Sequence, residues 1–228
     1  MSTSKTATVQ DAAFDTHEMV IVHRAFRRET RLLAELIAVA EPGDTARARV
    51  LAAHFADVRL GLHNHHRGED ELLWPPLLGR VGREAGVVLR MEAQHERVAA
   101  TLAAVDTAMG AWAVTAGETE RDALVAALAE NRSVLLEHLD DEEAELLPLA
   151  ARYLTASQWQ ALGDHFVRST PKTKLLMFLG MVLEDADEGE RALMLSSLPA
   201  PARFVWSLLG RPLYARAVRR VRAEPAAT

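Results

Sequence analysis

The chain has 228 residues, of which 49% are hydrophobic and 25% charged, a composition typical of a globular protein with a sizeable core. The net charge of −6 argues against general nucleic-acid binding, because neutralising phosphates requires an excess of Lys and Arg. Cysteine is absent, which excludes disulfides, thiolate metal sites, iron–sulfur clusters and cysteine nucleophiles. The N-terminal segment lacks the apolar stretch of a secretory signal, and the longest apolar run, Leu175 to Leu183, is too short to span a bilayer. These features predict a soluble cytoplasmic protein.

Helices dominate the predicted structure, because Ala and Leu are frequent while Gly (12) and Pro (9) are few. Residues 1–14 are predicted to form a disordered lead-in. Proline, glycine and capping residues place four long helices at about 15–40, 44–73, 84–113 and 118–147. Pro148 is expected to end the last helix. Four long helices with short connections predict an all-α, up-down four-helix bundle over residues 15–150.

A different pattern begins after Ala150. Thr155 with Gln158 forms a capping-box signature, and Asp187 with Glu190 resembles another helix start. Thr170-Pro171 places a proline at the first position of a further helix. Residues 151–228 are therefore expected to form a helical C-terminal extension of short helices, frayed over 223–228.

Two matching fragments near the ends of the second and fourth helices form an internal repeat. His65 is followed four residues later by Glu69, and His138 by Glu142. An acid-rich turn and a Leu-Leu pair follow each glutamate, and a proline stands six residues beyond it. Residues four apart lie on the same face of a helix, so each pair can point at one site.

One further histidine precedes each pair at almost the same distance, His23 by 42 residues and His95 by 43. In an antiparallel hairpin the end of the second helix lies beside the start of the first. Packing two such hairpins together therefore brings four imidazoles and two carboxylates into the interior, where a bare carboxylate is very costly. Six donors suit two divalent ions bridged by the glutamates better than one tetrahedral ion. The candidate metal ligands are His23, His65, Glu69, His95, His138 and Glu142.

A single His-x3-Glu pair usually means a solvated ion pair, and a single core histidine is more often a hydrogen-bonded packing residue. The same histidines and glutamates recur in both halves of the chain, which favours a two-metal site over a solvated ion pair or a packing histidine. This arrangement resembles the hemerythrin-like (HHE cation-binding) family over about residues 15–150. The resemblance implies a four-helix bundle with two non-haem iron ions, bridged by an oxo or hydroxo group. Spacing alone leaves Mn and Zn open, and affinity alone favours Zn over Fe(II).

The chain departs from the oxygen-carrying members of that family at Ala99. Those members have a second histidine one turn beyond the position of His95, and alanine cannot ligate. His66, about 100° around the helix from His65, is a possible additional ligand, since some family members place one there. His63 is expected at the surface. His54 lies three helical turns before His65 on the same face and is expected to be buried and hydrogen-bonded rather than a ligand. His17 and His165 have no partner pattern and are expected to be structural.

The segment from Arg203 to Arg222 carries six arginines and no acid, with apolar residues between them. It predicts an amphipathic helix that covers the bundle, with arginines toward solvent or the acidic bundle surface. A membrane-surface or partner-binding helix is the alternative. The expected interruption at Gly210-Arg211-Pro212 makes the membrane reading the weaker one.

The same ligands would serve three classes of function. The leading one is a di-iron protein that binds or reacts with oxygen-derived small molecules (O2, peroxide or NO), in an oxidative-stress or redox response. Peroxide decomposition would make it an enzyme, a question left open by the residues. The alternatives are an iron- or oxygen-sensing module that signals to a protein partner through the C-terminal helices, and a reversible oxygen binder. Alanine at position 99 predicts poor reversible carriage.

Overall fold

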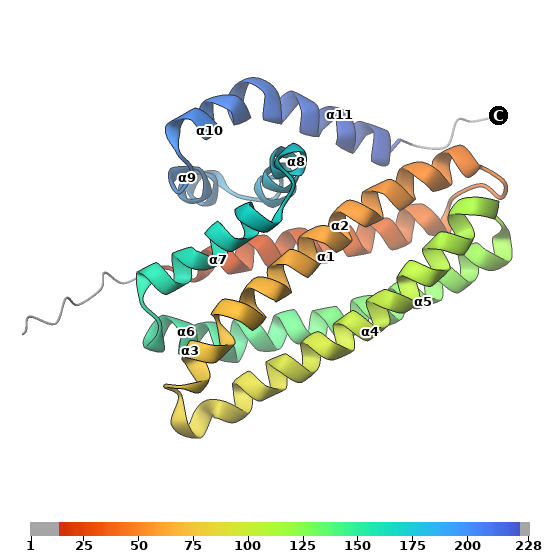
Figure 1. The fold of residues 1–228 in the computed structure, drawn as a ribbon. Helices are drawn as coiled ribbons and strands as arrows, with labels where there is room; N and C mark the ends of the chain where they lie inside the picture. The colour runs from red at the N-terminus through yellow and green to blue at the C-terminus, as the bar shows by residue number, and fades with distance from the viewer. Residues whose placement is uncertain (1–13, 224–228) are drawn as a thin grey trace, which may run out of the picture.

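The computed structural model describes residues 14–223, and within that range the regular structure is helical with no strand. Four long helices lie side by side as a bundle (Figure 1). They are α1 (His17–Ala38), α2 (Thr45–Leu72), α4 (Ala85–Thr115) and α5 (Glu118–Asp141). α1 packs against α2 and α5, and α4 packs against α2 and α5, so the four form a closed ring of contacts. The predicted all-α class and helical bundle are confirmed.

The core of the bundle is layered along its axis. An apolar layer containing Leu62 and Leu135 lies on one side of the candidate ligands in the order of residues along each helix. A second apolar layer, which contains Leu73, Met91 and Leu146, follows on the other side. The histidines and glutamates therefore occupy a polar layer between two apolar layers. The apolar side chains on both sides shield this layer from water along the bundle axis.

Short helices and irregular helical turns follow α2 and α5 next to this polar layer. α2 is followed by the short helix α3 (Trp74–Leu78) and the 3₁₀ turn η1 (Gly82–Glu84). α5 continues into a π-helical turn, η2 (Glu142–Leu146), and then into α6 (Leu147–Tyr153). The prediction that the helix ends at Pro148 is wrong, because the π turn lets Pro148 sit in the first turn of α6, where a missing N–H costs little.

The C-terminal segment forms a layer on the α1 and α2 side of the bundle (Figure 1). Its elements are α7 (Ala156–Ser169), α8 (Lys172–Leu183), α9 (Glu188–Ser196), α10 (Ala200–Val205), the π turn η3 (Trp206–Gly210) and α11 (Arg211–Val221). Both predicted capping boxes, at Thr155 and Asp187, are present. Pro171 is the N-cap of α8 rather than its first helical residue. Most of the predicted lead-in and of the frayed end lies outside the described residues.

Ion pairs hold this layer to the bundle. Arg28 of α1 donates to Asp185 Oδ2 at 2.7 Å and to the Met181 carbonyl oxygen at 2.7 Å. Arg24 contacts Glu190 of α9 at 2.8 Å. The predicted break at Gly210-Arg211-Pro212 is wrong, since the chain stays helical from α10 through η3 to the end of α11.

One described helical segment, Gly82–Thr115, is long and apolar enough to cross a membrane by length and composition alone. In the structure it contributes α4 to the bundle. Its buried stripe includes Val88, Met91, Val98 and Val105, and it carries His95 into the polar layer.

Candidate metal centre

The polar layer gathers side chains from all four long helices. α1 contributes His23, α4 contributes His95, and α5 contributes His138, with Glu142 at the start of the π turn that follows. α2 contributes three groups, because its last turns face the bundle interior with two successive histidines and a glutamate. Every one is buried: His23, His65, His66, Glu69, His95, His138 and Glu142. All six predicted ligands thus share one layer, and the structure adds His66 to them.

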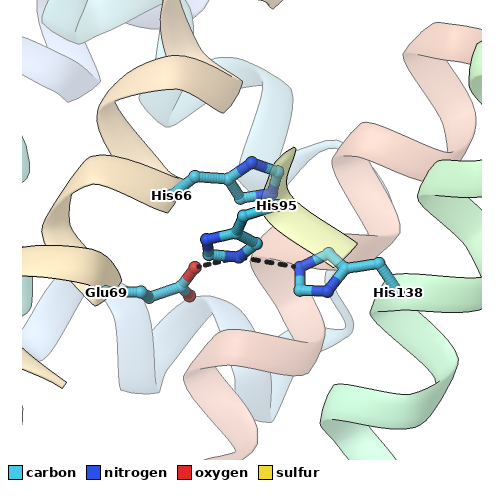
Figure 2. Close-up of side chains that lie close together, drawn as sticks. All are labelled: His66, Glu69, His95 and His138. Carbon is cyan, nitrogen blue, oxygen red and sulfur yellow. Dashed lines mark hydrogen bonds and ion pairs between the residues drawn. The ribbon is translucent and has the colours of Figure 1, made fainter. Parts of the chain in front are cut away.

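These donors fall into two groups, each with four atoms within 4.8 Å of one another. The first group consists of His23, His65, Glu69 and Glu142. The second consists of His66, Glu69, His95 and His138 (Figure 2). Glu69 is shared by both groups.

The imidazoles meet in the pairs that the sequence predicts. His23 Nε2 and His65 Nε2 are 3.2 Å apart, and His95 Nε2 and His138 Nε2 are also 3.2 Å apart. Two such nitrogens at this separation need either a proton or a cation between them, because each carries a lone pair when unprotonated.

The two glutamates each reach both histidine pairs. Glu69 Oε1 lies 3.4 Å from His65 Nε2, and its Oε2 lies 3.4 Å from His95 Nε2. Glu142 Oε2 lies 3.4 Å from His23 Nε2 and 3.5 Å from His138 Nε2. This is the placement that bridging carboxylates need.

The ring of His66 stacks on that of His95, with centroids 4.0 Å apart and an interplanar angle of 16°. His66 Nε2 is buried and has no hydrogen-bond partner among the described residues. His63, two residues before His65, is exposed as predicted. His63 therefore lies outside the cluster of buried histidines, whereas metal ligation by His65 and by His66 stays a prediction.

Burial sets the charge state of this layer. It lowers the pKa of His65 and His66 well below the ordinary value, and it lowers the pKa of His138 to about 2, with neighbouring imidazoles adding to the effect. These histidines are therefore neutral nitrogen donors at pH 7. Burial raises the pKa of Glu69 and Glu142, and for Glu69 the nearby Glu142 charge raises it further. Without a cation, the two carboxylates resist sharing this layer in ionised form.

Two acidic residues outside the predicted set orient the paired histidines. Asp70 Oδ1 accepts from His95 Nδ1 at 2.7 Å, and Glu143 Oε1 accepts from His23 Nδ1 at 2.9 Å. Burial raises the pKa of Asp70, but its hydrogen bonds with His95 and the Trp74 indole outweigh this, and the net shift is downward. Each acid directly follows a candidate ligand glutamate. This repeated position was the sequence signal that could have revealed them.

Each of these acids belongs to one half of the repeat and holds the histidine of the other half. Asp70 follows α2's Glu69 and holds His95 of α4, whereas Glu143 follows Glu142 and holds His23 of α1. A carboxylate on Nδ1 fixes the ring orientation and leaves Nε2 pointing at the cation position. Each half of the repeat therefore supplies the carboxylate that orients a histidine of the other half.

A cleft of about 500 Å³ lies against the second group, between α2 and α4. His66 and His95 line its inner wall together with Trp74, Ala99 and Leu102. The side chain of Ala99 is a single methyl group, which helps keep this cleft open. The second group therefore has a route to solvent.

The donor set fits divalent cations. Both carboxylate oxygens of Glu69 and of Glu142 are buried without a hydrogen-bond donor among the described residues. Such oxygens are costly to bury bare and are stabilised by a bound cation. Imidazole nitrogen with carboxylate oxygen suits Fe, Mn and Zn alike, so the geometry identifies a cation site without choosing the element.

Comparison with known families gives one match, to the hemerythrin HHE cation binding domain, over residues 15–150. Neither the curated proteins nor the solved structures contain a significant match to the chain. The matched range covers the four long helices and every residue of the two donor groups. The chain therefore belongs to the hemerythrin HHE cation-binding family.

Proposed function

We propose that this protein binds two non-haem iron ions and reacts with oxygen-derived small molecules, hydrogen peroxide above all, in an oxidative-stress or redox response. The observation that carries the proposal is the pair of four-donor groups sharing Glu69. A single group would serve one ion of any kind. Two groups that share a carboxylate suit two ions that act on one small molecule.

Iron is proposed as the metal because the resemblance to the hemerythrin HHE family implies iron, and the imidazole and carboxylate donors are compatible with it. Metal analysis of the native protein tests this directly. We expect about two iron ions per chain and near-ultraviolet absorption of the oxidised protein. One zinc ion and no iron, after expression in iron-replete medium, would contradict the proposal.

Iron, when bound, would supply the electrons for reducing a peroxide. The chain's own residues would do the rest. Asp70 and Glu143 hold two histidines in place, so little rearrangement is needed during reaction. The apolar layers on both sides limit access of water, whereas the cleft past Ala99 admits a small polar molecule to the second group.

This cleft favours reaction over reversible oxygen carriage, because a carrier benefits from a single iron position with restricted access. We therefore expect the reduced protein to oxidise in air and to react with hydrogen peroxide. Ala99→His should narrow the cleft and slow both reactions. Ala100→His is the matched control, because this residue is exposed on the same helix and does not line the cleft.

Stopped-flow absorbance of the anaerobically reduced protein, mixed with peroxide or with air-saturated buffer, measures both rates. Equal rates in wild type and Ala99→His would refute the role of the cleft. Reversible uptake and release of dioxygen under vacuum would return the protein to the carrier class. Consumption of peroxide in excess of the protein, either with release of dioxygen or with an added reductant that restores the ferrous ions, would establish an enzyme. A single oxidation of the two ferrous ions would not.

An iron- or oxygen-sensing module is the second candidate function, and one contact favours it. Asn64, beside the ligand candidate His65, donates to Thr170 Oγ1 at 3.0 Å at the junction of α7 and α8. A shift of α2 on metal loss would therefore reach the extension. Hydrogen exchange of residues 156–183 with and without metal tests this, and equal protection would argue against it.

The location and the physiological partners stay predictions. A cytoplasmic location is proposed from the sequence, and cell fractionation tests it. The small-molecule partner is proposed to be a peroxide or a diatomic gas, and a protein partner of the C-terminal helices belongs to the sensing alternative. A protein recovered only outside the cytoplasm would contradict this setting.

A further inference from the structure

Large apolar side chains are concentrated on the outer face of the helical run α10–η3–α11. Phe204 is 65% exposed and Leu208 is 60% exposed, and three more follow the same pattern. These five side chains define the outer apolar face: Phe204, Val205, Leu208, Leu209 and Leu213. They make up more than half of the large hydrophobic side chains that are exposed in the described chain. Single exposed apolar residues are ordinary, but five within ten positions form a patch.

The opposite face of this helical run packs against the rest of the protein. The outer apolar side chains are therefore exposed on a helix that is already held in place. Trp206 is buried, and its ring lies so close to Gly210 that a Cβ there would collide with it. Tyr214 packs against Gly180 of α8 in the same way and donates a hydrogen bond to Glu184. Arg222 adds contacts to Glu184 at 2.5 and 2.9 Å. Figure 1 shows the run as the outermost layer of the molecule.

The charge along this region is of one sign. Residues 191–223 contain seven arginines and no acid, in a chain whose net charge is −6. Five arginines of the run α10–η3–α11 are exposed and form no ion pair within the described chain: Arg203, Arg211, Arg216, Arg219 and Arg220. Their long aliphatic stems can lie along apolar surface while the guanidinium groups reach anionic groups. The helix therefore combines an apolar face with unpaired positive charge.

We propose that this outer apolar face binds the surface of a lipid bilayer rich in anionic lipids. The helix would lie in the interface with its leucines and Phe204 among the upper acyl chains and its arginines at the headgroups. A second copy of the chain is a poorer occupant, because it would bring the same unpaired arginines face to face. The sequence predicted a break at Gly210 that would have weakened membrane binding, but the helix is continuous there.

Vesicle flotation of the full-length metal-loaded protein tests the proposal. We expect binding to vesicles of equal parts phosphatidylcholine and phosphatidylglycerol, little binding to phosphatidylcholine alone, and release at about 0.5 M salt. The triple variant Phe204→Ser, Leu208→Ser, Leu209→Ser should bind at least about 100-fold more weakly. Its matched control replaces three equally exposed apolar residues elsewhere by serine: Val39, Leu89 and Val114.

A charge variant separates electrostatic from apolar contributions. Arg211→Gln with Arg219→Gln should weaken binding roughly 30-fold at low salt, and the difference should shrink as salt is added. Arg83→Gln with Arg168→Gln, two exposed arginines outside the run, should change little. Circular dichroism confirms that each variant keeps its fold.

Three outcomes would overturn the proposal. The first is absence of binding to the anionic vesicles, and the second is equal binding by the triple variant and its control. The third is a dimer in solution, measured by light scattering, that the triple variant converts to a monomer without any vesicle binding. That result would assign the outer apolar face to a second copy of the chain.

Discussion

Replacing His66 by alanine should remove one of two iron ions and leave the other. His66 belongs only to the second donor group, so the variant keeps all four donors of the first group and three of the second. Losing the carboxylate that orients a ligand histidine typically costs 10–100-fold in affinity, and losing a ligand should cost at least about that much. After desalting, we expect the variant to retain about one iron ion per chain and the wild type about two.

Glu69→Gln should give a different result, because Glu69 is the one residue common to both groups. Its Oε1 faces His65 and its Oε2 faces His95, so loss of the charge weakens both ions together. His63→Ala is the control, since this exposed histidine lies only three positions from His66 on the same helix. It should retain the iron content of the wild type.

The assay is anaerobic reconstitution with ferrous iron, followed by desalting, elemental analysis and titration with a competing chelator. The informative result is the amount of iron retained by the wild type compared with the three variants described above. Retention of two tightly bound ions by His66→Ala would refute the placement of this residue in the second group. Equal iron loss in His63→Ala and His66→Ala would refute the geometry of this whole stretch of α2.

Removing the metals with a chelator should lower the melting temperature, because the metal-free protein keeps buried carboxylate oxygens without hydrogen-bond donors; identical melting of both forms would show that the ions bind elsewhere. Asp70→Asn should weaken iron retention about 10–100-fold by releasing the ring of His95, whereas the exposed Glu71→Gln should not, and equal retention would remove Asp70 from the site. The ion pair with Arg24 and further hydrogen bonds lower the pKa of Glu190 to about 2 from an ordinary 4.5. This stabilisation is complete above pH 4.5 and is lost as the pH falls toward 2. The difference in melting temperature between metal-free wild type and Glu190→Gln should therefore narrow over that range, and a constant difference would contradict it.

Local regularities of the chain were enough to predict the fold class and the six central residues of the site. His65 and Glu69, like His138 and Glu142, share a helix face because the helix turns once every 3.6 residues, whatever surrounds it. The capping boxes at Thr155 and Asp187 are equally local, because they need only the residues within one turn. The repeat added the long-range information, because two hairpins with the same ligand spacing bring their ligands to one level when they pack together.

The tertiary structure alone decided which donors form each group and which residues support them. The direction of His66 depends on how α2 is rotated about its axis, and that rotation is set by packing against the helices around α2. The cross-pairing of Asp70 with His95 likewise exists only once α2 lies against α4. The π turns that carry the chain past Pro148 and Pro212 are also not visible in the sequence, where proline by itself predicts the end of a helix. A sequence determines what each helix can present on its faces, whereas packing between helices, made of contacts distant in the chain, determines what each face meets.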